Sequence, residues 1–244
     1  MKAVFSFLYQ WLIFTPLLVI ATIITAVLVM CGCTIGKHKF WGYVPPKYWS
    51  KIVCRLALCR IKVKLNPKVE SGKSYVFVAN HQGAFDIFLT YGYLNQNIKW
   101  VQKSELRKLP FVGKASEIAG HVFVDSSSPK AMFQTIEKAE EELVEGVSMV
   151  IFPEGARTLN AKMGRFKKGA YVIATQMQLP IVPITLNGPY NVLKRNTSTM
   201  HFGKTMEIIV HDPISTQGST ADHIPELIEQ SRRAIESGLW EEFR

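Results

Sequence analysis

The stretch between Lys2 and Lys37 constrains this chain most, because no charged side chain lies between those two lysines. Its central part, residues 11–29, is almost wholly apolar and matches the roughly 20 residues that cross a hydrocarbon core as a helix. The stretch is too long for a cleaved signal peptide, and no small-residue cleavage site follows a short apolar core. Pro16 interrupts it, so a re-entrant hairpin resting in one leaflet competes with a full span. We therefore expect residues 1–36 to form a hydrophobic membrane anchor of one of these two kinds.

Positive charge dominates the next segment. Residues 37–68 carry nine Lys or Arg and no acidic residue, which nearly accounts for the net charge of +10. We expect this segment to rest on an anionic membrane surface, with residues 47–58 forming an amphipathic helix. The positive flank predicts that the rest of the chain lies on the cytoplasmic face of the inner (plasma) membrane. No zinc-finger, helix-turn-helix or RNA-binding signature is present, so we exclude nucleic acid as a partner. Aromatic residues interleave with the charges, as in an interfacial belt: Trp41, Tyr43, Tyr48 and Trp49.

Residues 69–244 alternate between strand-like and helix-like patterns without a repeat or a flexible linker. Such alternation predicts one α/β domain with a mixed, largely parallel sheet flanked by helices. The four cysteines match no zinc or redox spacing, so we expect no metal site. We predict strands at residues 74–79, 98–102, 121–124, 149–152, 181–186 and 206–210, and helices at residues 84–94, 129–145, 167–177 and 221–240.

A histidine and an aspartate lie five residues apart where the first of these strands meets a helix. The segment is Asn-His-Gln-Gly-Ala-Phe-Asp, residues 80–86. A histidine can take a proton from a hydroxyl group, and a carboxylate can fix its tautomer and stabilise the imidazolium. Five residues along a helix would separate the two side chains by about 140°. The pairing therefore requires that His81 precede the helix and that Asp86 lie in its first turn.

Three further segments follow in a defined order. They are Gly-His-Val-Phe-Val-Asp at residues 120–125, Phe-Pro-Glu-Gly-Ala-Arg-Thr at 152–158, and Leu-Pro-Ile-Val-Pro-Ile at 179–184. Together with residues 80–86, they resemble the four signature blocks of the glycerolipid acyltransferases, specifically the 1-acylglycerol-3-phosphate (lysophosphatidic acid) acyltransferases. The resemblance covers about residues 74–186, and the first and third blocks are the specific ones.

The resemblance implies transfer of an acyl chain from a thioester donor, acyl carrier protein or coenzyme A, to the sn-2 hydroxyl of the lysophospholipid acceptor 1-acylglycerol 3-phosphate. His81 would act as the general base, and Asp86 would support it. The chain has no Gly-x-Ser-x-Gly nucleophile motif, which agrees with direct attack by the acceptor hydroxyl. This chemistry requires neither a metal nor a cofactor.

The resemblance also implies residues that bind the acceptor. Arg157 and Lys103 are the cations expected at its phosphate, and the Gly155 turn would bring backbone amides close to it. Glu154 is expected to position the acceptor or its loop. Lys167 and Lys168 form a further basic pair that could face anionic head groups.

One position departs from the family pattern. The second block usually continues into an arginine, but Ser126 follows Asp125 here. The phosphate site therefore lacks one expected cation, which leaves a lyso-aminolipid open as an alternative acceptor. A catalytically silent membrane protein of the same fold is the remaining alternative, although the presence of both His81 and Asp86 argues against it.

Overall fold

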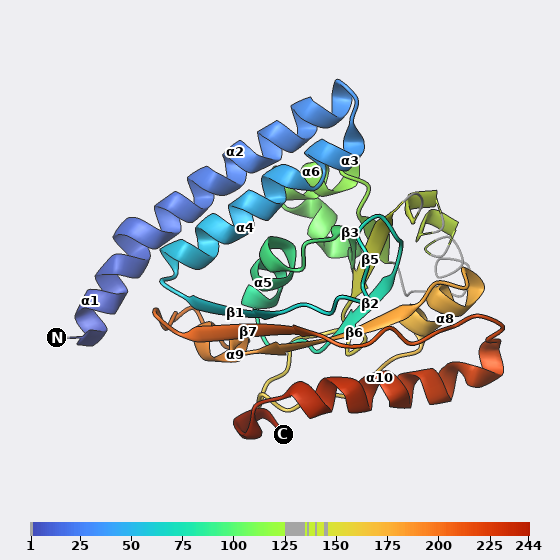
Figure 1. Ribbon diagram of the computed structural model, residues 1–244. Helices are drawn as coiled ribbons and strands as arrows, with labels where there is room; N and C mark the ends of the chain where they lie inside the picture. The colour runs from blue at the N-terminus through green and yellow to red at the C-terminus, as the bar shows by residue number, and fades with distance from the viewer. Residues whose placement is uncertain (1, 125–134, 136, 140, 144–145) are drawn as a thin grey trace.

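The computed structural model describes residues 2–124, 135, 137–139, 141–143 and 146–244 (Figure 1). Its centre is a seven-stranded sheet in the order β1-β7-β6-β2-β5-β3-β4. All neighbouring strands are parallel except β6 and β7, so the expected mixed, largely parallel sheet is confirmed. The strands are β1 (Arg60–Lys64), β2 (Val76–Ala79), β3 (Asn97–Lys103), β4 (Val122–Val124), β5 (Val147–Ile151), β6 (Ile181–Asn187) and β7 (Thr205–Val210).

Helices cover both faces of this sheet, as Figure 1 shows. Alternate residues of β2 point to opposite faces. Phe77 joins the core beneath α4 (Val44–Leu56) and α5 (Phe85–Tyr93), whereas Val76 joins the core beneath α8 (Gly169–Gln176) and α10 (Ile224–Gly238). Both cores are therefore built from strands that are apolar on both sides, as buried parallel strands are. Further short helices are α3 (His38–Trp41), α6 (Val112–Ile118) and α9 (Pro189–Val192).

The N-terminal residues form one long helix. It comprises α1 (Lys2–Tyr9), a π-helical turn (Gln10–Phe14) and α2 (Thr15–Thr34). The chain does not reverse at Pro16. That proline follows the π-helical turn, at a place where the α-helical hydrogen-bond pattern is already interrupted. Residues 4–34 are long and apolar enough to cross a membrane by length and composition, and only 17% of the most apolar window is buried.

The long helix packs back onto the domain through α4. The indole N–H of Trp49 on α4 donates to the Thr22 hydroxyl on α2 at 3.1 Å. The ring of Trp41 occupies the space where a side chain at Gly32 would lie, 2.1 Å from an added Cβ. Close packing therefore requires glycine at position 32. The long helix and α4 together form a hairpin over the sheet (Figure 1).

One difference from the sequence expectations concerns β1. Strand β1 lies in the basic segment expected at the membrane interface, and it pairs with β7 at the sheet edge. Charged residues on an exposed edge strand protect it from pairing with other chains, so Arg60, Lys62 and Lys64 concealed a strand in a charge-rich pattern. Most of the expected helix 129–145, together with Asp125 and Ser126, lies outside the described residues. All six predicted strands and the three other predicted helices are present, with ends shifted by at most three residues.

Candidate active site

The first site segment is the turn that joins β2 to α5. β2 ends at Ala79, and α5 begins at Phe85, so His81 precedes the helix and Asp86 lies in its first turn. The two side chains meet, with 2.6 Å between His81 Nδ1 and Asp86 Oδ2. The same carboxylate oxygen accepts the Gly83 N–H at 2.8 Å. This is the arrangement that the spacing required.

Burial and hydrogen bonding oppose each other at Asp86. Its side chain is fully buried, whereas that of His81 is 16% exposed. Burial raises the pKa of Asp86, and the hydrogen bond and charge of His81 and the Gly83 N–H act to lower it. Because the Asp86 carboxylate is shielded from solvent, it accepts the hydrogen bond from the imidazole N–H. This contact favours the Nδ1–H tautomer and leaves Nε2 as the proton acceptor.

An aromatic stack holds the imidazole by its face. The ring of His81 lies on Phe152, with 3.9 Å between the centroids and 7° between the planes. Phe152 in turn stacks on Trp100 of β3 at 5.5 Å. His81 is therefore fixed at one edge by Asp86 and on one face by Phe152, which leaves little rotational freedom about its side-chain bonds.

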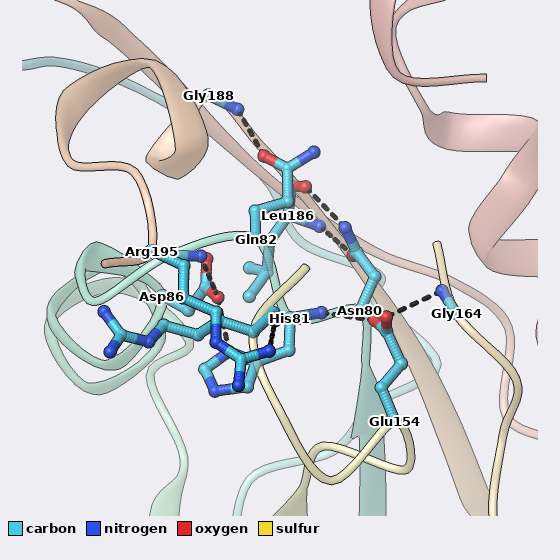
Figure 2. Close-up of polar contacts among 11 residues, drawn as sticks. Asn80, His81, Gln82, Asp86, Glu154, Gly164, Leu186, Gly188 and Arg195 are labelled. Carbon is cyan, nitrogen blue, oxygen red and sulfur yellow. Dashed lines mark hydrogen bonds and ion pairs between the residues drawn. The ribbon is translucent and has the colours of Figure 1, made fainter. Parts of the chain in front are cut away.

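Glu154 binds two backbone amides. Its Oε1 accepts the His81 N–H at 2.7 Å, and its Oε2 accepts the Gly164 N–H at 2.7 Å (Figure 2). Burial raises the pKa of Glu154, and these two backbone hydrogen bonds act to lower it. The carboxylate thus joins the His81 turn to the loop at residue 164, and both of its oxygens are engaged within the protein. This geometry makes Glu154 a residue that positions the loop.

The segment after Glu154 runs alongside His81. Gly155 has a φ of +73°, a conformation that favours glycine, and its N–H donates to Phe152 O at 3.0 Å. The Thr158 N–H donates to the His81 carbonyl at 2.9 Å. The side chain of Arg157, half-buried, forms no ion pair with any residue in the described ranges. Its guanidinium is therefore available to a ligand.

Lys103 and Lys167 lie at two other places near this sheet edge. Lys103 is the exposed last residue of β3, and no contact between it and His81 is present. Because β2, β3 and β5 are parallel, their carboxyl ends meet at one edge, where open α/β sheets bind ligands. The ammonium of Lys167 lies 2.9 Å from a Cβ placed on Gly155, so that lysine covers the Gly155 turn. Lys168 is exposed.

Three polar residues at the site carried no signal in the sequence pattern. The Asn80 amide makes two hydrogen bonds with the Leu186 backbone, donating to O at 2.9 Å and accepting from N at 2.8 Å. Gln82 Oε1 accepts the Gly188 N–H at 3.0 Å. Arg195 donates through Nη1 to the Arg157 carbonyl at 2.8 Å. Figure 2 shows Asn80 and Gln82 extending the pairing of the sheet beyond the end of β2. Within the described ranges, no group of three His, Cys, Asp or Glu side chains could hold a metal ion.

Comparison with known proteins gives consistent results. The chain is 30% identical over 192 residues to human 1-acyl-sn-glycerol-3-phosphate acyltransferase alpha, covering 75% of this chain and 68% of that protein. It is 30% identical to a 1-acyl-sn-glycerol-3-phosphate acyltransferase of Chlamydomonas reinhardtii, over 68% of this chain and 49% of that protein. The chain spans about half the length of the first curated relatives it matches.

A solved structure has the same fold. The crystal structure of the 1-acyl-sn-glycerophosphate (LPA) acyltransferase from Thermotoga maritima matches with a TM-score of 0.79 at 22% identity, covering 98% of each chain. The family model described as Acyltransferase matches residues 60–187, which include β1 to β6 and the site residues from Asn80 to Lys168. This chain therefore belongs to the acyltransferase family.

Proposed function

We propose that this protein transfers an acyl chain from a thioester donor to the free sn-2 hydroxyl of 1-acylglycerol 3-phosphate, giving phosphatidate. The observation that carries the proposal is the contact of His81 with the buried Asp86, 2.6 Å apart, at the carboxyl edge of the sheet. The choice of substrate is supported by relatives that are named 1-acyl-sn-glycerol-3-phosphate acyltransferases.

The pair has the geometry of a general base. Nε2 of His81 takes the proton of the acceptor hydroxyl as its oxygen attacks the thioester carbonyl. Asp86, bonded to Nδ1–H, stabilises the imidazolium that forms. The tetrahedral intermediate collapses, the carbon–sulfur bond breaks, and the thiolate leaves with the proton that His81 holds. Because both substrates react within one complex, no enzyme nucleophile is needed.

Backbone amides after Gly155 are suited to the oxyanion of that intermediate. The N–H of Gly155 itself is engaged with Phe152. The next two amides, of Ala156 and Arg157, have no acceptor among the described residues. Two free amides at a left-handed glycine turn form an anion-binding concavity.

The phosphate of the acceptor would be bound by cations at the same edge. The Arg157 guanidinium can form a bidentate pair with a phosphate, and Lys103 can add a point charge at the end of β3. Glu154 contributes by fixing the His81 turn, and Gly155 by its left-handed conformation. No metal or cofactor takes part in this scheme, and acyl carrier protein and coenzyme A are both suitable donors.

The protein would work at a membrane. The apolar long helix provides the anchor, and the basic segment 37–68 faces anionic lipid. We place the acyltransferase domain on the cytoplasmic face of the inner (plasma) membrane, where a water-soluble thioester donor is available.

The test is acyl transfer by the purified, detergent-solubilised protein, with lysophosphatidate and a lyso-aminolipid offered in parallel. We expect conversion of lysophosphatidate, and a loss of about 10²–10⁴-fold in His81→Ala. A preference for the lyso-aminolipid would retain the base and reject the acceptor. Activity of His81→Ala above about a hundredth of wild type would remove His81 from the base role.

A further inference from the structure

The loop that carries Arg157 is held from two sides. On one side, the Thr158 N–H donates to the His81 carbonyl at 2.9 Å. On the other side, the chain that includes and follows α9 reaches across it. Arg195 donates to the Arg157 carbonyl at 2.8 Å, and the Tyr190 hydroxyl donates to the Leu159 carbonyl at 3.1 Å. Residues 157–159 are thus clamped between the His81 turn and residues 190–195.

Arg195 brings a positive charge and several further N–H donors to this clamp. A guanidinium has five N–H donors in a planar fork, and the contact with Arg157 O uses one nitrogen. The side chain of Arg195 is half-buried, and it forms no ion pair with an acidic residue in the part of the chain that the structure describes. No acidic residue of the described ranges therefore neutralises its charge.

Arg195 contacts the loop next to His81. The carbonyl that it binds belongs to Arg157, and the following residue, Thr158, donates its N–H to the His81 carbonyl. In Figure 2, the Arg195 side chain extends toward the region of His81 and Asp86. Arg195 is thus linked to the Arg157 backbone, and neither guanidinium has an acidic partner among the described residues. A dianionic ligand bound at this loop would be attracted by both positive charges.

The acceptor that the proposed function assigns carries such a group. A phosphate monoester has a charge of about −1.5 to −2 near pH 7 and three strong acceptor oxygens. Arg195 adds a second cation to the loop that carries Arg157, where such a group would bind.

We propose that Arg195 is a second phosphate-binding arginine, which holds the Arg157 loop through one nitrogen and contacts the acceptor phosphate through the others. This inference rests on the proposed function and deepens it. It makes Arg195 a determinant of specificity for a phosphorylated acceptor over a neutral one.

The test compares two acceptors, lysophosphatidate and monoacylglycerol, in the full-length protein. Arg195→Ala should lower kcat/KM for lysophosphatidate by about 10- to 100-fold, mainly through KM, as expected for a charge-assisted hydrogen bond. The slower transfer to monoacylglycerol should change by less than about twofold, and Arg195→Lys should recover part of the loss. Lys162→Ala is the matched control, because it removes an exposed cation from the same surface and should leave both rates unchanged.

Three results would overturn the inference. An equal loss with both acceptors would reduce Arg195 to a structural clamp, and an unchanged KM for lysophosphatidate would remove it from the phosphate. Equilibrium binding of lysophosphatidate in mixed micelles without donor tests the same point independently of turnover, and a wild-type dissociation constant in Arg195→Ala would also overturn it. Failure of the proposed function has a different signature, since the wild-type protein would then transfer no acyl chain to lysophosphatidate.

Discussion

Replacing Glu154 with glutamine should separate activity from stability in this protein. The Glu154 carboxylate accepts one backbone amide with each oxygen, from His81 and from Gly164, both at 2.7 Å. Glutamine has one acceptor oxygen, and its NH₂ group must face the other N–H. One of the two backbone donors therefore loses its partner and meets a second donor, although the side chain keeps its size.

The structure indicates the magnitude of each effect. A hydrogen bond to a charged group contributes about 1.5–3 kcal/mol, which corresponds to about 10- to 150-fold in rate if it holds the reactive geometry. Folding stability should respond differently. Burial raises the pKa of Glu154, so the folded state favours its protonated form. That contribution to stability is present at low pH and is lost as pH rises through the folded pKa. At neutral pH the ionised carboxylate thus weakens the fold, and removal of that charge offsets the stability lost with one of the two hydrogen bonds.

The assay is steady-state acyl transfer together with thermal unfolding in the same detergent at pH 7.5. We expect Glu154→Gln to lose about 10- to 150-fold in kcat with a Tm equal to or above that of wild type. Glu241→Gln, at an exposed position, is the control for removal of a carboxylate. A kcat within threefold of wild type, or a Tm that falls in step with activity, would refute this reasoning.

Three other outcomes follow from the described contacts. Asp86→Asn should lower kcat by about 10³–10⁴-fold with little change in KM, because an amide does not stabilise the imidazolium of His81; steady-state kinetics would measure this, and a loss below tenfold would contradict it. Asn80→Ala leaves the Leu186 N–H and C=O without partners, which should lower the unfolding free energy by about 2–4 kcal/mol, seen as a clear fall in Tm. Burial lowers the pKa of His121 from 6.5 to about 3, so its contribution to stability is present above pH 6.5 and is lost as pH falls toward 3. Wild type should therefore lose more Tm between pH 7 and 5 than His121→Asn does, and equal slopes would contradict this.

Much of the fold could be predicted because its signals are local. Buried parallel strands such as β2 and β5 are continuous apolar runs between turn residues, and their periodicity requires no tertiary information. The His81–Asp86 pair could be predicted for the same reason, since its geometry depends on a single strand-to-helix turn. β1 was missed because its alternating basic residues, Arg60, Lys62 and Lys64, also match the basic segment expected at a membrane surface.

The rest of the site depends on contacts between distant residues. Arg195 meets Arg157 across 38 positions of the chain, and Asn80 meets Leu186 across 106. Nothing in the local pattern around Arg195 distinguishes it from the exposed Lys194 beside it. The role of Glu154 as a double acceptor depends on the path of the loop to Gly164, which sequence periodicity does not specify. Such pairings arise from the way β2, β5 and β6 align, so they become visible only in the assembled sheet.

The connection between α4 and β1 has a consequence for engineering. Residues 57–59 alone separate the helix that packs on α2 from a strand of the sheet, and Cys54 and Ala57 share a core cluster with Met206 of β7. Residues 1–68, which include α4 and β1, are therefore an integral part of the folded domain and cannot be removed as a separate module. Deleting residues 1–68 would uncover that core and leave β7 as a bare edge open to aggregation. A soluble form would instead keep every helix and replace the outward-facing apolar side chains of the long helix, such as Phe5, Leu12 and Ile24, with polar ones.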